Sequence, residues 1–300
     1  MPLNNFICPD KGVIPVQECL EKCRLGKRCL TLPTLSLISQ EREWAGIAST
    51  TQLLNGTMME YLKLTKPYNI DPDSRTFMLS GTKHHKALED AANELGVASE
   101  VALSVDRDIF DLIEVENGKI GMTDYKLWGS YRIAKALGMT KVGTKPDPSG
   151  AVYKTTSKWG KAGEPKMVSV FQAIAENADN WEAEYQQNRY RVMLKKLGIT
   201  LDWMQLQVTV RDGGLAVARN RGLERNSYII PIKFIPDETI ESYFSYKNDC
   251  LMKALEEGWT EPCTPQENWD GERCRRYCDV WEYCPLGLEK HNKEQGEDYA

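Results

Sequence analysis

The chain has 300 residues, a formal net charge of −5, 41% hydrophobic residues and 27% charged ones. These values are ordinary for a soluble globular protein of one large domain or two smaller ones. The net charge gives no overall attraction to nucleic acid, so such binding would need a local basic patch. No apolar run approaches the roughly 20 residues that span a bilayer, and the first residues lack the pattern of a secretory signal. We therefore expect a cytoplasmic protein that does not bind a membrane.

Eight of the nine cysteines form two quartets with the same spacing, C-x10-C-x3-C-x5-C, one near each end of the chain. The quartets are Cys8, Cys19, Cys23 and Cys29, and Cys263, Cys274, Cys278 and Cys284. Without a secretory signal, metal ligation is more common for such thiols than disulfide formation. Four thiolates complete a structural zinc site or a 4Fe-4S iron–sulfur cluster, and spacing alone does not choose between them. We predict Cys-rich metal-binding segments at both ends.

The first third of the chain is expected to hold three helices. A short helix over 17–29 would carry Cys19 and Cys23 one turn apart, and one over 51–64 would follow an N-cap at 49–51. The third, over 83–96, would open at 80–82 and close at a glycine. It carries His85 on its apolar stripe, where a histidine is more often a buried core residue than a ligand. A strand is expected over 99–105.

Residues 109–127 are predicted to form a β-hairpin. Asn117-Gly118 lies between two apolar-rich runs, which favours a two-residue type I′ turn. In that register Asp111 faces Asp124, and Lys126 shares their face. Like charges directly opposed on an apolar face are destabilising, and a divalent cation between them would remove the conflict. The alternatives are a slipped strand or carboxylates that point into solvent at a sheet edge.

Residues 128–180 are expected to contain a helix over 128–137 and no strong strand. Six lysines of this region are interleaved with Tyr153 and Trp159. This pattern suits contact with a single nucleic-acid strand, with lysines on phosphates and rings on bases, or it is a solvated loop.

The last third is expected to begin with the clearest helix of the chain, over 181–197. Gln186 and Tyr190 lie on one face of it. Strands are expected over 203–210 and 227–234, and a helix over 238–258. A polar, frayed tail should follow the second cysteine quartet.

Several of these pieces occur in the order of a known family. The run GTKHHKALE, residues 81–89, resembles the GTxxHxxLE motif of RecB-like nucleases in the PD-(D/E)XK superfamily. Asp111 resembles the first acidic position, 124–126 the D/E-x-K element, and 186–190 the QxxxY helix. The C-terminal C-x3-C-x5-C run resembles the branch with an iron–sulfur cluster, which includes CRISPR-associated nucleases and the helicase–nuclease subunits of bacterial recombination.

The resemblance implies an α/β fold with a PD-(D/E)XK (restriction-endonuclease-like) core, in which helices flank a mixed sheet. The expected organisation is a Cys-rich segment over 1–35, a nuclease core over 36–250 with a basic insertion over 138–180, and a Cys-rich segment with a polar tail over 251–300. The implied activity is metal-dependent hydrolysis of DNA, by an exonuclease that acts on single strands or ends, with a helicase or another DNA-processing protein as a partner.

The resemblance also implies a role for each site residue. Asp111, Asp124 and the main-chain carbonyl of Tyr125 would hold Mg²⁺ or Mn²⁺, with His85 as a further ligand that favours manganese. Lys126 would orient or activate the attacking water. Gln186 and Tyr190 would position the lysine or the nucleic-acid backbone. The alternatives are a catalytically silent DNA-binding or scaffold subunit and an enzyme that cuts RNA.

The chain departs from the family pattern in three places. The usual glycine before the first acid is replaced by 108–110, and the stretch between Lys126 and Gln186 is longer than usual. The family takes one cluster cysteine from the helix before the histidine motif, whereas 50–64 contains none. Either each quartet binds its own metal, which we favour, with iron–sulfur at the C-terminal quartet and zinc at the N-terminal one, or the C-terminal cysteines recruit one from the N-terminus.

Overall fold

The computed structural model describes residues 3–41, 43–103 and 108–297. The chain divides into two compact units, which are described separately. Unit 1 comprises Met1–Phe110, Tyr185–Thr200 and Phe234–Ala300, and unit 2 comprises Asp111–Glu184 and Leu201–Lys233. Helices and sheets occur together, and parallel and antiparallel strand pairs occur in one sheet, so the expected mixed α/β class is confirmed. Both Cys-rich ends belong to unit 1.

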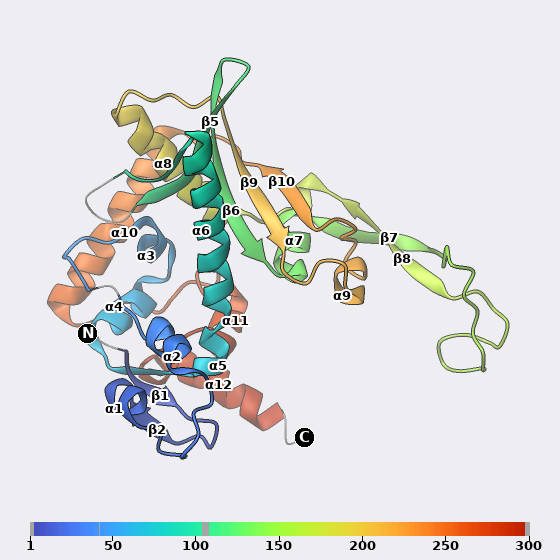
Figure 1. The fold of residues 1–300 in the computed structure, drawn as a ribbon, viewed down its shortest axis with the longest axis horizontal. Helices are drawn as coiled ribbons and strands as arrows, with labels where there is room; N and C mark the ends of the chain where they lie inside the picture. Colours follow the sequence, from blue (N-terminus) through green and yellow to red (C-terminus); the bar gives the residue numbers. More distant parts are fainter. Residues whose placement is uncertain (1–2, 42, 104–107, 298–300) are drawn as a thin grey trace. The chain divides into compact units, whose positions relative to one another are not determined.

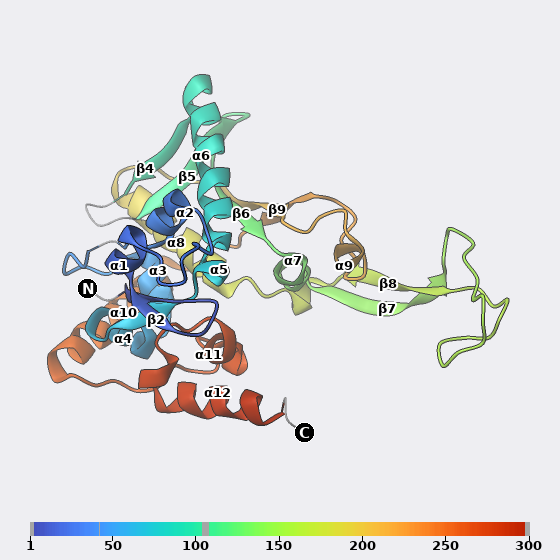
Figure 2. The same cartoon turned by 60° about the horizontal axis from the view of Figure 1, so that its bottom comes forward.

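The N-terminal part of unit 1 is a small three-stranded sheet with two short helices. The strands β1 (Leu3–Ile7), β2 (Val13–Pro15) and β3 (Tyr68–Ile70) lie in the order β2-β1-β3, and the helices are α1 (Val16–Glu21) and α2 (Leu32–Ile38). Figures 1 and 2 show α1 beside β1 and β2. The helix expected over 17–29 ends early because Lys22 is already extended, so Cys23 lies beyond it.

The helix expected over 51–64 is two helices, α3 (Thr50–Leu54) and α4 (Thr57–Thr65), which are separated at Asn55-Gly56. The expected N-cap is confirmed, because Ser49 and Gln52 form a capping box. After α5 (Pro72–Arg75), α6 (Phe77–Leu95) begins earlier than predicted and ends at Gly96, as predicted. Strand β4 (Ala98–Ala102) follows. Residues 104 and 105 of the strand expected there lie outside the described residues.

The other helices of unit 1 come from distant parts of the chain. They are α8 (Trp181–Lys196, whose first four residues belong to unit 2), α10 (Asp237–Glu257), α11 (Glu272–Arg276) and α12 (Pro285–Glu297), with the 3₁₀ turns η2 (Trp269–Gly271) and η3 (Trp281–Tyr283). Helix α10 packs on α3 and α4, and Leu194, Ile240 and Leu251 are buried in the core. The tail is helical to Glu297 rather than frayed, and 298–300 lie outside the described residues.

Four strands of unit 2 lie side by side in the order β10-β9-β6-β5. They are β5 (Ile109–Glu116), β6 (Lys119–Trp128), β9 (Trp203–Val210) and β10 (Ser227–Pro231). The β6–β9 pair is parallel and the other two are antiparallel. Every second residue of β9 is buried, as expected of a strand with one face in a core. The short helices of this unit are α7 (Ser130–Ala136), η1 (Ala175–Asn177) and α9 (Ala216–Arg219).

The expectation of no strong strand over 128–180 was wrong. Strands β7 (Met139–Pro146) and β8 (Met167–Ala173) form a separate two-stranded antiparallel ribbon. Their side chains are mostly exposed, so the sequence carries no apolar alternation that would reveal them. Figures 1 and 2 show the ribbon extending away from β9 and β10. Among the described helices, none is both long and apolar enough to cross a membrane.

Candidate functional site

The β5–β6 hairpin has the predicted turn and register. Asn117 and Gly118 both have positive φ, 52° and 76°, as a type I′ turn requires. The strands pair from Leu112 with Thr123 to Glu116 with Lys119, so opposed residue numbers sum to 235. One step further along the same register, Asp111 stands opposite Asp124. The alternative of a slipped strand is therefore wrong.

Both carboxylates belong to unit 2, and both are buried. Asp111 is 8% exposed and Asp124 is 3% exposed, which excludes carboxylates that point into solvent. Oδ2 of Asp111 accepts a hydrogen bond of 2.6 Å from the main-chain N–H of Tyr125. Oδ2 of Asp124 lies 2.7 Å from Nζ of Lys126. The expected burial of the surrounding apolar face is confirmed at Met122, which is fully buried. It is wrong at the hairpin tip, where Val115 is 69% exposed.

Negative charge exceeds positive charge around Lys126. Burial alone would lower the pKa of this lysine, but Asp124, Asp111 and Glu182 outweigh that effect and hold its pKa above the ordinary value. Lys126 is therefore protonated and lies in the field of three carboxylates. Carboxylate oxygens are the hard donors that Mg²⁺ and Mn²⁺ prefer. The residues present fit a divalent cation.

Glu182 was not expected from the sequence to belong to this cluster. It lies in the first turn of α8, four residues before Gln186, and one helical turn places it on the same face as that residue. This spacing is the only sequence signal that could have pointed to it. Tyr125 was expected to supply its main-chain carbonyl to the metal. The structure shows that its N–H fixes Asp111, and the role of its carbonyl stays a prediction.

The other predicted site residues belong to unit 1 and form two pairs there. His85 Nδ1 lies 3.6 Å from Oε1 of Glu100, a residue that the motif did not include and whose own φ is positive, 49°. Gln186 Nε2 donates a hydrogen bond of 3.2 Å to the hydroxyl of Tyr190, which is buried. The structure thus brings together Asp111, Asp124 and Lys126 in one unit and these two pairs in the other. That all of them act in one reaction stays a prediction.

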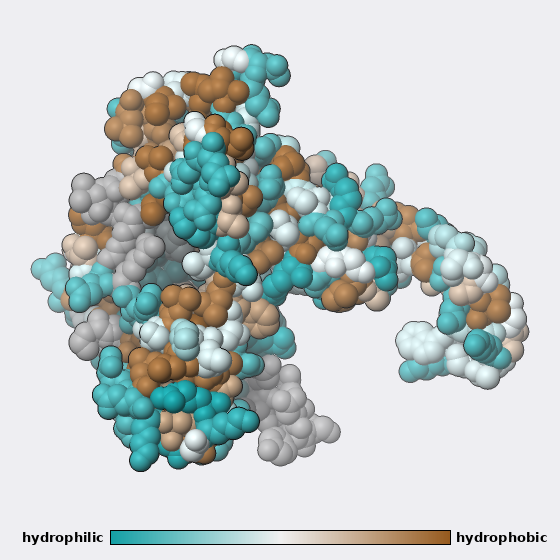
Figure 3. Space-filling view, viewed as in Figure 1, coloured by the Kyte–Doolittle hydropathy of each residue, from teal (hydrophilic) through white to brown (hydrophobic). Residues whose placement is uncertain are grey.

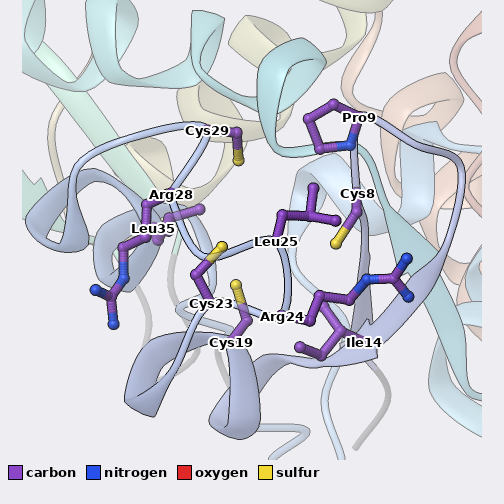
Figure 4. A pocket seen from close by; sticks show the side chains of 10 residues that line it. All are labelled: Cys8, Pro9, Ile14, Cys19, Cys23, Arg24, Leu25, Arg28, Cys29 and Leu35. Atoms are coloured by element: carbon purple, nitrogen blue, oxygen red, sulfur yellow. The ribbon is translucent and has the colours of Figure 1, made fainter.

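The N-terminal quartet converges on one small cavity of unit 1. All four thiols line it, and Figure 4 shows their sulfurs pointing into a common space. Cys8 follows β1 in a tight turn closed by the hydrogen bond from its N–H to the carbonyl of Gly12, and Cys19 lies on α1. Burial raises the pKa of the Cys8 and Cys19 thiols. A bound cation would offset this cost of forming thiolates.

Cys263 of the C-terminal quartet lies against the start of α4. A Cβ on Gly56 would lie only 2.2 Å from Sγ of Cys263, and the main-chain N–H of Met59 donates to that sulfur. Burial raises the pKa of Cys263 to about 12 and that of Cys278 to about 11. The family pattern places a cysteine on the helix over 50–64. Here the cysteine next to that segment is Cys263, which comes from the C-terminal part of the chain rather than from the helix itself.

The electrostatic interactions between cysteines occur within each quartet. Among the described residues, the cysteines that act electrostatically on Cys8 and Cys19 are those of the N-terminal quartet, and those that act on Cys263 and Cys278 are C-terminal. This arrangement favours two separate sites. In the described part of the chain, no three of these sulfurs lie within 4.8 Å of one another, whereas zinc bonds of 2.3 Å would place them about 3.8 Å apart. Iron–sulfur or zinc at either quartet stays a prediction.

Comparison with known proteins adds little to this geometry. No family model matches the chain, and no curated protein matches it. A solved structure described as "Crystal structure of SSO0001" aligns with 91% of this chain and 94% of its own, at 14% sequence identity and a TM-score of 0.39. We draw neither a fold family nor a function from a similarity of this size.

Proposed function

We propose that this chain is a metal-dependent DNA nuclease with a PD-(D/E)XK core, in which Asp111 and Asp124 hold Mg²⁺ or Mn²⁺ and Lys126 stands beside them. The observation that carries the proposal is the pair of opposed, buried carboxylates in the β5–β6 register. Two buried like charges destabilise a fold unless a cation lies between them. A scaffold protein would gain nothing from keeping such a pair.

A bound divalent cation supplies charge stabilisation at the scissile phosphate and a hydroxide near neutral pH. The chain's own residues orient the reaction. The N–H of Tyr125 holds Oδ2 of Asp111 in place. The ammonium of Lys126, anchored by Asp124, can donate to a phosphate oxygen or to the attacking water. His85, Gln186 and Tyr190 are proposed as the further ligand and the positioning residues, as expected from the sequence.

The cysteine quartets are proposed as structural sites for iron–sulfur clusters or zinc. Both quartets belong to unit 1. All four thiols of the N-terminal quartet line one space, and burial raises the pKa of Cys8 and Cys19. This favours ligation of a metal over isolated thiols, because a close cation would stabilise the thiolates. A brown protein that absorbs near 400 nm would indicate iron–sulfur, and a colourless one with stoichiometric zinc would exclude it.

The proposal is tested with end-labelled DNA, single- and double-stranded, linear and circular, with Mg²⁺ or Mn²⁺ added or withheld. The wild type should degrade linear DNA from its ends only when the metal is present. Asp124→Ala and Lys126→Ala should each lose activity by about 100-fold or more, as expected for groups that act on the transition state. Glu114→Gln is the matched control, because Glu114 lies on the opposite face of β5 and should keep full activity.

Three outcomes would contradict the proposal. Retained activity in both the Asp124 and the Lys126 variants would place the chemistry elsewhere. Binding of DNA without degradation under any metal would favour the scaffold alternative. Degradation of RNA but not DNA would change the substrate. Circular dichroism spectra of the variants should match the wild type, so that lost activity is not lost folding.

A further inference from the structure

The β7–β8 ribbon and its tip, residues 139–173, form an exposed arm of unit 2, called the lysine arm below. An isolated two-stranded ribbon is marginal in water, because it has no core of its own. The lysine arm is held at its root. Asn177 Nδ2 donates to Thr140 Oγ1 at 2.8 Å, and a Cβ on Gly222 would meet Met139 and Phe171 at 2.5 Å. The root is therefore fixed, while the rest is presented to solvent.

The lysine arm is strongly basic in an acidic chain. It carries six lysines against Asp147 and Glu164, a net charge of +4, whereas the whole chain carries −5. All six are exposed: Lys141, Lys145, Lys154, Lys158, Lys161 and Lys166. Among the described residues, none of the six forms an ion pair. Figure 3 shows hydrophilic residues over the lysine arm with isolated hydrophobic ones among them.

One of those hydrophobic side chains has the geometry for stacking. Trp159, near the tip, is 73% exposed, and the Nζ atom of Lys158 lies 4.9 Å from its ring centroid. The isolated bridge between Ser157 and Gly160 closes the tight turn that presents this ring. An exposed tryptophan beside unpaired lysines can stack on a base while the lysines contact the phosphates. A base pair in a duplex does not offer its face in this way.

We propose that the lysine arm binds single-stranded nucleic acid, with lysines on the phosphates and Trp159 stacked on a base. The arm and the carboxylates belong to the same unit, and β6, which carries Asp124 and Lys126, leads through α7 directly into β7. The inference deepens the proposed function. It rests on that function only for the reason why a strand is bound, which is to hold the nucleic acid that the proposed nuclease cuts. The binding itself is measured without cleavage.

The experiment measures fluorescence anisotropy of a labelled 20-nucleotide oligo-dT with full-length Asp124→Asn protein and no added divalent cation. Against this background, Lys158→Ala with Lys161→Ala should weaken binding about tenfold and reduce the slope of log K against log salt by about 1.4, since each phosphate contact to a single strand contributes about 0.7. Trp159→Ala should weaken binding by about 5- to 100-fold, and Trp159→Phe should retain most of the affinity.

Matched controls come from unit 1. Lys66→Ala with Lys253→Ala removes the same charge from two exposed lysines, and Trp259→Ala removes a tryptophan that is 58% exposed. These variants should bind like the background protein. A 20-base-pair duplex should bind more weakly than oligo-dT and be insensitive to Trp159→Ala. Oligo-U in place of oligo-dT separates RNA from DNA as the natural strand.

The inference is overturned if the lysine and Trp159 variants bind oligo-dT as tightly as the controls, which would favour an acidic protein as the partner of the lysine arm. It is also overturned if Trp159→Ala weakens duplex binding equally. These results are distinct from a failure of the proposed nuclease. An inactive wild type whose oligo-dT binding depends on Trp159 would refute the nuclease and keep the strand-binding arm.

Discussion

Lys126 lies on the same face of β6 as Asp124, two residues further along, with its Nζ atom 2.7 Å from Oδ2 of that aspartate. Asp111 faces Asp124 across the hairpin and is held by the N–H of Tyr125. Lys126 thus interacts electrostatically with the two opposed carboxylates and also with Glu182. The cluster therefore joins three carboxylates to one ammonium, and carboxylate oxygens are the donors that a divalent cation prefers.

The hairpin turn should depend on glycine at one position. Gly118 has a φ of 76° and no atom within 4 Å of a Cβ placed on it, so Gly118→Ala introduces backbone strain without a clash. We expect a loss of about 1 kcal/mol in the free energy of unfolding, measured with urea. Gly143→Ala in β7 is the control, because Gly143 also has open space but no positive φ, and it should be neutral or slightly stabilising. Equal effects of the two substitutions would contradict a type I′ turn.

The hairpin was predictable because local turn chemistry fixed a register, and the register then fixed which side chains meet. Asn117-Gly118 carries this information in two residues. The lysine arm was missed because its strands bury almost nothing, so a buried apolar face does not mark them, although both contain β-branched residues such as Val142 and Val168. The gap between α3 and α4 falls at Asn55-Gly56, a turn-favouring dipeptide like Asn117-Gly118, so a local signal for it was present in the sequence.

The close approach at Gly56 gives a way to disable one cysteine quartet alone. Gly56 has an ordinary φ of −63°, so the effect of Gly56→Ala comes from displacement of the Cys263 sulfur. We expect this variant to lose the metal of the C-terminal quartet and to keep that of the N-terminal one. Metal analysis of the purified protein measures the content, and Cys278→Ser should have the same effect.

The control for the cysteine experiment is Gly81→Ala, because Gly81 has no atom within 4 Å of a Cβ placed on it. Cys250→Ser is a second control, since Cys250 belongs to neither quartet. Both should keep the full metal content. If Gly56→Ala removed metal from both quartets in proportion, the two would share one site.

Lys247 should be important for the C-terminal quartet through its partners. It is 5% exposed, pairs with Glu267, and donates to the Asn55 carbonyl and Thr57 Oγ1 at 3.0 Å each. Glu267 in turn accepts from the N–H of Thr264, next to Cys263. Lys247→Met leaves Glu267 without its cation, so we expect a loss of about 3–5 kcal/mol in the free energy of unfolding.

The comparison for Lys247 is Lys253→Met on the same helix. Lys253 is exposed and lies 3.8 Å from Glu257, four residues further along. Exposed pairs of this kind contribute about 0.3–0.5 kcal/mol, so the two variants should differ clearly by chemical denaturation. Equal stability of the two would show that the buried pair does not hold α4 and the C-terminal segment together.

Asp237 should give unit 1 a pH-dependent stability. Hydrogen bonds from Lys195 and Arg191, at 2.6 and 2.7 Å, hold the pKa of this carboxyl below its ordinary value. Because the folded pKa is lower than the unfolded one, the contribution is complete above about pH 4 and is lost as the pH falls through the folded pKa. The stability difference between wild type and Asp237→Asn should therefore shrink on acidification. A difference that stays constant from pH 6 to pH 2 would contradict the pairing.

The most direct test of the central proposal is Mn²⁺ binding followed by the loss of the free-ion signal in electron paramagnetic resonance. The wild type and Glu114→Gln should each bind Mn²⁺ at one site in unit 2, and both Asp111→Asn and Asp124→Asn should lose that binding while remaining folded. Wild-type Mn²⁺ binding in Asp124→Asn would show that the opposed carboxylates of the β5–β6 hairpin do not hold the catalytic metal.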